Sequence, residues 1–155
     1  MPDRPSITAE HDVVRARPRV LFVCVKNGGK SQMAEALMRH VAGDGVDAAS
    51  AGTRAGTAVN TLSADSLLEL GIDIRGNTPR QLTADLVDAS DLVVVLGQDA
   101  EVDPGRGTPV ERWETDEPSE RGIEGIERMR LVRDDILDRV AALNERLTPS
   151  GPNGP

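Results

Sequence analysis

The order of apolar and polar residues along the chain predicts strands that alternate with helices. Residues 20–25 form an unbroken apolar run, Val-Leu-Phe-Val-Cys-Val, and residues 92–96 form another, Leu-Val-Val-Val-Leu. Such runs are typical of strands buried on both faces, as in a parallel sheet. A further short strand is predicted around residues 47–50.

The segments between these runs have helical spacing. Met33, Leu37 and Val41 recur every four residues, which predicts a helix that begins near Lys30 and ends near Gly43. The other predicted helices cover residues 60–70, a short segment with Thr83 as its N-cap, and residues 122–147. Residues 97–122, rich in glycine, proline and charge, are predicted to form a long loop.

Strands alternating with helices predict an α/β fold with right-handed crossovers and a doubly wound sheet. We expect a polar arm over residues 1–18, one domain over residues 19–148 and a tail over residues 149–155. Ligands of such sheets bind beyond the carboxyl ends of the strands. Cys24 lies at the carboxyl end of the first predicted strand, so its position already suggests a functional role.

Composition excludes several classes of partner. The 155 residues carry a net charge of −8, which makes nucleic acid and anionic membrane surfaces poor partners. Only Phe22 and Trp113 are aromatic, so the core is expected to be aliphatic and base-stacking platforms are excluded. His11 and His40 are isolated, and we therefore predict no metal site.

The chain has a single cysteine, so it cannot form an internal disulfide. This fits a reducing compartment. Residues 1–19 contain no apolar signal-peptide core, and no apolar run approaches the length of a membrane span. We therefore expect a cytoplasmic protein.

The segment that joins the first strand to the first helix has the features of an oxyanion-binding loop. Gly28 and Gly29 let the backbone curl so that successive N–H groups point inward, and Asn27 tolerates left-handed backbone angles. The helix that begins near Lys30 adds its positive N-terminal end. The predicted oxyanion-binding residues are Val25, Lys26, Asn27, Gly28, Gly29, Lys30 and Ser31.

These groups should hold Cys24 as the thiolate. The chain contains only two lysines, Lys26 and Lys30, and both lie within six positions of Cys24. Ser31 could donate a hydrogen bond to the sulfur. A thiolate beneath a bound tetrahedral oxyanion is placed for in-line attack on its central atom.

Two simpler interpretations remain open. A lone cysteine at the end of an apolar strand is often a core residue. A glycine-rich turn between strand and helix could instead bind a nucleotide phosphate. The Gly-x4-Gly-Lys-Ser/Thr pattern is incomplete here, however, because Cys24 occupies the position of its first glycine.

The pattern Cys24-x5-Lys30-Ser31 after a first strand resembles the low-molecular-weight protein tyrosine phosphatases and the arsenate reductases that share their fold. The resemblance covers about residues 19–147. It includes residues 31–36, 50–53, 71–73, 80–83 and 91–95, and residues 112–130 are similar to the mycothiol-dependent arsenate reductases of actinobacteria. It implies a three-layer, flavodoxin-like domain with four parallel strands.

The resemblance also implies an activity. Arsenate would be the substrate and Cys24 the nucleophile. Mycothiol would serve as cosubstrate and mycoredoxin as the downstream partner, with no bound cofactor. Thioredoxin-coupled relatives carry two further cysteines, which this chain lacks, so an external thiol would have to resolve the intermediate.

Two other activities remain possible for this sequence. The first is a protein phosphatase. Phosphatases of the family have arginine where this chain has Lys30, and lysine offers a point charge in place of a bidentate fork. The second is a regulatory module that binds an oxyanion without turnover. The oligomeric state is left open.

The family places an acid just before a proline on the loop that precedes the last helix. Here the sequence is Asp116-Glu117-Pro118; we favour Asp116 as the general acid, with Glu117 as the rival and a solvated acidic loop as the alternative. Trp113 is either a side chain over the site or a core residue. The arginines of the last helix, Arg128, Arg130 and Arg133, are predicted to form a solvated face, with contact to an anionic cosubstrate as the less favoured alternative.

Overall fold

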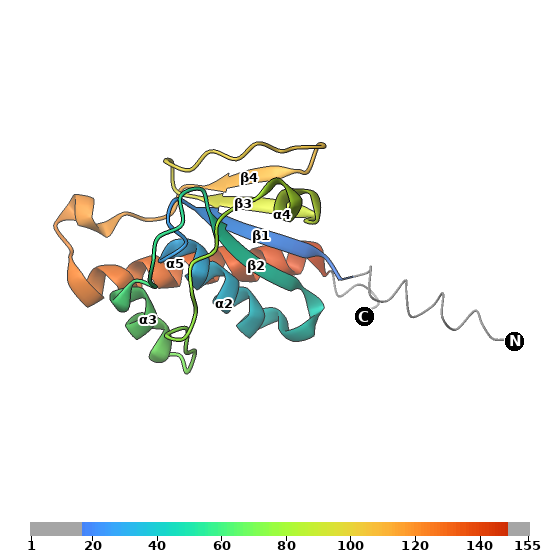
Figure 1. Ribbon diagram of the computed structural model, residues 1–155. Helices are drawn as coiled ribbons and strands as arrows, with labels where there is room; N and C mark the ends of the chain where they lie inside the picture. The colour runs from blue at the N-terminus through green and yellow to red at the C-terminus, as the bar shows by residue number, and fades with distance from the viewer. Residues whose placement is uncertain (1–16, 149–155) are drawn as a thin grey trace, which may run out of the picture.

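A four-stranded parallel sheet lies between helices in the computed structural model, which describes residues 17–148 (Figure 1). The strands are β1 (Arg19–Cys24), β2 (Asp47–Gly52), β3 (Leu92–Leu96) and β4 (Val110–Trp113), in the order β2-β1-β3-β4. The predicted tail over residues 149–155 and all but the last two residues of the predicted arm lie outside the described residues.

Helices cover both faces of the sheet. They are α2 (Lys30–Ala42), α3 (Thr61–Leu68), α4 (Ala84–Asp88) and α5 (Gly125–Leu147), with short 3-10 segments η1 (Gly43–Gly45) and η2 (Pro118–Arg121). Side chains of α2, α3 and α5 share one buried cluster, whereas α4 contributes to a second cluster on the other face. The predicted doubly wound α/β fold is therefore confirmed. Within residues 17–148, no helix has the length and apolarity needed to cross a membrane.

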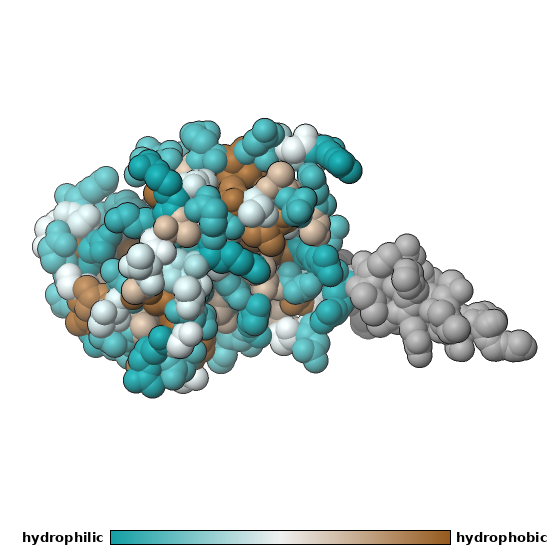
Figure 2. Space-filling model, viewed as in Figure 1, coloured by the Kyte–Doolittle hydropathy of each residue, from teal (hydrophilic) through white to brown (hydrophobic). Residues whose placement is uncertain are grey.

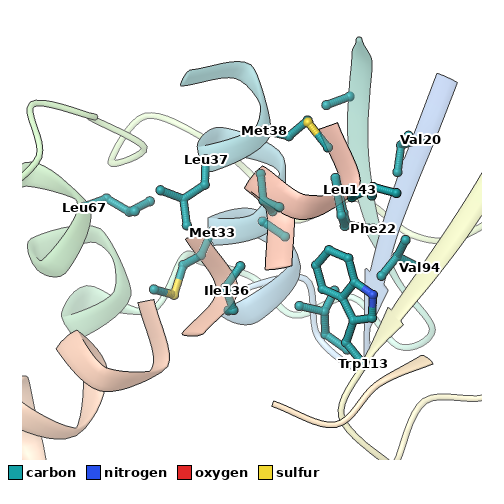
Figure 3. Packing of buried hydrophobic residues seen from close by; sticks show 14 of the residues in the cluster. Val20, Phe22, Met33, Leu37, Met38, Leu67, Val94, Trp113, Ile136 and Leu143 are labelled. Carbon is teal, nitrogen blue, oxygen red and sulfur yellow. The ribbon is translucent and has the colours of Figure 1, made fainter. Parts of the chain in front are cut away.

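The strand β1 shows why its apolar run is unbroken. Val20 and Phe22 face α2 and α5, and Leu21 and Val23 face the α4 side. All four are at most 1% exposed, because the strand pairs with β2 on one edge and β3 on the other. Figure 3 shows Phe22 and Trp113 side by side in the larger cluster, with their ring centroids 5.8 Å apart.

Most predicted boundaries are close to those observed. Thr83 is the N-cap of α4, since its hydroxyl accepts a hydrogen bond from the N–H of Leu86 at 3.2 Å. The last helix begins at Gly125, three residues later than predicted, because Gly122 takes a left-handed conformation after η2. Hydrophilic residues cover most of the visible surface of these helices and loops (Figure 2).

The prediction of one long loop over residues 97–122 is wrong. This segment contains β4, which pairs with β3 from Val110 to Trp113, and it also contains η2. The strand was not recognisable as an apolar run because it lies at the edge of the sheet. Of its four residues only Trp113 is buried. That burial decides the role of Trp113, which is a core residue, with its Nε1–H donating to Glu111.

The prediction of a solvated arginine face on α5 is wrong for Arg133, which is 8% exposed. Its guanidinium donates to the carbonyl of Ser66, at the end of α3, and to the carboxylate of Glu69. Arg130 donates to the same carboxylate. Arg133 follows the buried Met129 by four residues, so helical spacing puts it on the same side of α5, where α3 covers it and the carbonyl of Ser66 accepts its hydrogen bond.

This arginine pair predicts a pH dependence of stability. Hydrogen bonds from Arg130 and Arg133 lower the pKa of Glu69 from 4.5 to about 2. A carboxyl group with a lowered folded-state pKa stabilises the fold above its unfolded pKa, and that contribution is lost as pH falls through about 2. We therefore expect the difference in Tm between wild type and Glu69→Gln to shrink steadily below pH 4.5.

Thermal unfolding followed by circular dichroism at a series of pH values measures this difference. Glu145→Gln, which changes an exposed carboxylate elsewhere on α5, is the matched control and should shift the profile far less. A pH-independent difference for Glu69→Gln would show that the arginine pair does not couple to protonation.

Candidate functional site

The loop from Cys24 to Lys30 lies at the carboxyl end of the sheet, where residues 53–60, η2 and the start of α5 also gather (Figure 1). Residues 53–60 bind the outside of the loop through its carbonyl groups. The carbonyls of Cys24, Val25, Lys26 and Gly28 accept hydrogen bonds from the N–H groups of Thr53, Arg54, Gly56 and Asn60, at 3.0, 2.8, 2.9 and 2.6 Å.

Because the carbonyls point outward, the N–H groups of the loop are available on its inner side. No group among residues 17–148 accepts a hydrogen bond from the N–H groups of residues 26–31. Successive unpaired N–H groups that end in a helix N-terminus form a concave site for an anion. This is the arrangement expected from the glycine-rich sequence of the loop.

Asn27 organises the inside of the loop. It is 1% exposed and has a φ of 55°, the left-handed conformation expected for it. Its Oδ1 accepts hydrogen bonds from the N–H of Arg80 at 2.8 Å and from Gln32 Nε2 at 3.2 Å. Its Nδ2 donates to Ser31 Oγ at 2.8 Å. A buried side chain with these partners fixes the loop against the backbone of Arg80 and against α2.

Cys24 Sγ lies 2.9 Å from Ser31 Oγ. Ser31 already accepts the hydrogen bond from Asn27, so its own hydrogen is free to point at the sulfur. A hydroxyl that donates to a thiolate stabilises the ionised, nucleophilic form. Cys24 is half-buried, so the sulfur is neither sealed in the core nor fully exposed.

Gly52, at the end of β2, is where the loop passes closest to the sheet. A Cβ atom there would lie 2.6 Å from the carbonyl oxygen of Val25 and 2.8 Å from the nitrogen of Asn27. We expect Gly52→Ala to lower the free energy of unfolding by about 1–3 kcal/mol, since the loop would have to move. Urea denaturation measures this change.

Gly76→Ala is the control for that substitution, because a Cβ at Gly76 would meet nothing within 4 Å. We expect it to leave the unfolding midpoint nearly unchanged. Equal midpoints for the two variants would mean that the loop is not held against Gly52 in solution. A displaced loop should also weaken the binding of phosphate, which titration calorimetry can follow.

The two candidate acids lie in different surroundings. Glu117 forms ion pairs with Lys30 of the loop and with Arg128 of α5, the latter at 3.7 Å. Asp116 instead accepts hydrogen bonds from Arg121 at 2.8 and 3.2 Å, and these bonds hold the pKa of Asp116 below its ordinary value. Glu117 is therefore the carboxylate that contacts the loop.

Arg128 was not among the predicted site residues. Its side chain is 29% exposed, and its Nε is buried without a hydrogen-bond partner among residues 17–148. Helical spacing alone suggests only a solvated residue, because the segments that surround Arg128 come from other parts of the chain. The same residues 17–148 contain no group of His, Cys, Asp and Glu side chains able to hold a metal ion.

Several known proteins are similar in sequence to this chain. A family model described as low molecular weight phosphotyrosine protein phosphatase matches residues 19–104. The chain is 35% identical over 134 residues to an arsenate reductase of Halalkalibacterium halodurans, covering 81% of this chain and 94% of the relative. It is 33% identical over 120 residues to an arsenate reductase of Staphylococcus aureus, covering 76% and 88%.

Two solved structures are similar. One is a thioredoxin-dependent arsenate reductase of Corynebacterium glutamicum, with a TM-score of 0.70 and 33% identity, covering 92% of this chain and 67% of that one. The other is described as an arsenate reductase in the phosphate binding state, with a TM-score of 0.71 and 28% identity, covering 84% and 98%.

Proposed function

Because the chain belongs to the low molecular weight phosphotyrosine protein phosphatase family, we propose that it reduces arsenate with the help of an external thiol. The observation that carries this proposal is the single cysteine beneath an anion-binding loop, with Ser31 Oγ 2.9 Å from its sulfur. Relatives at 33% and 35% identity are described as arsenate reductases, which supports arsenate as the substrate.

In the first step the loop N–H groups hold the arsenate oxygens over Cys24. The sulfur forms a bond to arsenic, and one arsenic–oxygen bond breaks so that the oxygen leaves as water. Glu117, the carboxylate paired with Lys30, takes up the proton that Cys24 gives up as it becomes the thiolate, and passes it to this oxygen. Arsenate also competes for Lys30, which frees Glu117 from that ion pair. Arsenic remains at +5 in the adduct.

In the second step an external thiol displaces Cys24 from arsenic and takes over the arseno group, still at +5, and Cys24 regains its proton. A second thiol then attacks the sulfur of this adduct. The sulfur–arsenic bond breaks, its electron pair stays on arsenic, and arsenite leaves as the two thiols become a disulfide. Electrons therefore come from two thiols outside the chain.

We assign these thiols to mycothiol and mycoredoxin. The similar Corynebacterium glutamicum reductase is described as thioredoxin-dependent. Thioredoxin-coupled reductases of this family pass electrons through cysteines of their own, and this chain has only Cys24. A chain without a second thiol cannot form an internal disulfide for thioredoxin to reduce, which favours a small thiol as the first acceptor.

Protein phosphatase activity is the second candidate, and the family match favours it. Phosphoryl transfer gains much of its rate from an arginine that grips the equatorial oxygens, worth roughly 10³–10⁵-fold where measured. The corresponding side chain here is Lys30, and it is paired with Glu117. The structure therefore gives little support for efficient hydrolysis of phosphate esters.

The test is arsenate turnover by the purified protein. Rates are compared with mycothiol and mycoredoxin, with glutathione and glutaredoxin, and with thioredoxin alone, beside hydrolysis of p-nitrophenyl phosphate. We expect turnover with mycothiol and mycoredoxin. Turnover with thioredoxin alone would overturn the assigned thiol, and phosphate-ester hydrolysis without arsenate turnover would make the protein a phosphatase.

A further inference from the structure

A cavity of about 520 Å³ borders the loop on the side of α5. It lies within the range of about 300–1,000 Å³ that is usual for small-molecule sites. A single tetrahedral oxyanion in the loop would leave most of it unfilled. The cavity is lined by backbone and side chains of three segments, among them Gly28, Gly29, Ala58, Asn60, Arg128 and Met129.

Two glycines of the loop form part of the wall of this cavity. The cavity side of the loop carries Gly28 and Gly29, which have no side chain to fill it. A Cβ at Gly28 would lie 3.0 Å from the carbonyl oxygen of Ala58, and a Cβ at Gly29 would lie 3.5 Å from Ser63 Oγ. At these two glycines the loop therefore packs closely against residues 58–63.

The charge of the cavity is positive in a protein whose net charge is −8. Lys26, Lys30 and Arg128 all line it. Glu117 neutralises part of this charge through its ion pairs with Lys30 and Arg128, and three cations against one carboxylate leave the site with positive charge. Met129 and Val132 provide an apolar floor beside these cations.

From these observations we infer that the cavity binds the body of a low-molecular-weight thiol with hydroxyl, amide or carboxylate groups. This inference rests on the proposed function, because it supplies the second reactant of that reaction. Lys30 belongs to the loop and also lines the cavity, so the cavity adjoins the site of the oxyanion. The polar body would occupy the cavity while its sulfur reaches arsenic bound to Cys24.

The transfer of arsenic from Cys24 to the external thiol determines what the cavity must do. The thiol loses its proton, its sulfur bonds to arsenic, the bond from Cys24 to arsenic breaks, and Cys24 takes up a proton. Arsenic remains at +5, so no oxidant or reductant is needed at this step. Holding the thiol beside its target lowers the entropic cost of bringing two reactants together.

Met129 offers a direct probe of the cavity. The described chain contains two other methionines, Met33 and Met38, both completely buried in the core. We would label the methionine methyl groups with ¹³C and titrate the protein with mycothiol in the absence of arsenate, so that nothing is turned over. We expect a saturable shift of the Met129 methyl resonance and no shift of the core methyl resonances.

Ala58→Phe places a ring at the exposed rim of the cavity, and we expect it to weaken mycothiol binding about tenfold or more, a loss typical of a blocked contact surface. Ala84→Phe makes the same change on α4, on the opposite face of the sheet, and should leave binding unchanged. Arg128→Gln should also weaken binding, because it removes one of the three cations that line the cavity.

The outcomes separate the two proposals. A Met129 resonance that does not move with millimolar mycothiol, or that moves equally in Ala58→Phe and Ala84→Phe, overturns the thiol site even if arsenate turnover is intact. A normal Met129 response in a protein that fails to turn over arsenate supports the thiol site and overturns the arsenate activity.

Discussion

Replacing Cys24 with serine is expected to lower kcat/KM for arsenate by about three orders of magnitude or more, the scale of loss when a nucleophile is removed. Serine keeps the size of the side chain and its contact with Ser31, which lies 2.9 Å from the sulfur. The loop N–H groups are unaffected, so phosphate should still bind. Steady-state turnover and calorimetric titration with phosphate measure the two effects.

Ser31→Ala changes the other partner in the contact between Cys24 and Ser31, and it is the variant matched to Cys24→Ser. It removes one hydrogen bond to the sulfur but keeps the thiol, and we expect a loss of about tenfold, equivalent to roughly 1.4 kcal/mol. Full turnover by Cys24→Ser would show that residue 24 only positions the anion and that the external thiol attacks arsenate directly.

The second large effect is expected at Glu117. Glu117→Gln should lower kcat by about 10²–10³-fold, because general acid catalysis contributes on this scale. The substitution keeps the size of the side chain and a hydrogen-bonding oxygen for Lys30, so it chiefly removes the transferable proton. Single-turnover release of ¹⁸O from labelled arsenate into water reports the step directly.

Asp116→Asn is the control for that experiment. The side chain of Asp116 is held by hydrogen bonds from Arg121, which keep its pKa below its ordinary value, and within residues 17–148 it makes no hydrogen bond or ion pair with the loop, so it is not placed to pass a proton to the leaving oxygen. We expect a change of less than about threefold. A large loss in Asp116→Asn with a small loss in Glu117→Gln would reverse the assignment and restore Asp116 as the acid.

The parts of the fold that could be predicted are those with a local signal. The strands β1 and β3 are buried on both faces, so each is an unbroken apolar run in the sequence. The edge strand β4 has no such run, because Val110 is 40% exposed and only Trp113 is buried. The hydrogen bonds that make residues 110–113 a strand are formed with β3, and the sequence of these four residues alone does not indicate that pairing.

The candidate site likewise has one part that the sequence predicts and another part that it does not. Residues 24–31 are contiguous, so their spacing alone indicated an anion loop. The choice between Asp116 and Glu117 depended on which carboxylate Arg121 engages and which one reaches Lys30, 87 residues away. Arg128 was predicted chiefly as part of a solvated face, because the cavity that it lines is formed by three separate segments of the chain.

Residues 53–60 hold the loop carbonyls from outside, so the inner N–H groups are fixed in position before any ligand arrives. A rigid ring of donors responds to the shape and charge of a tetrahedral oxyanion and hardly at all to its central atom. Phosphate and arsenate share that shape and charge, so we expect them to compete on nearly equal terms. Discrimination between them would then come after binding, from the faster exchange of oxygen for sulfur at arsenic, and the rate in a cell would follow the ratio of arsenate to phosphate.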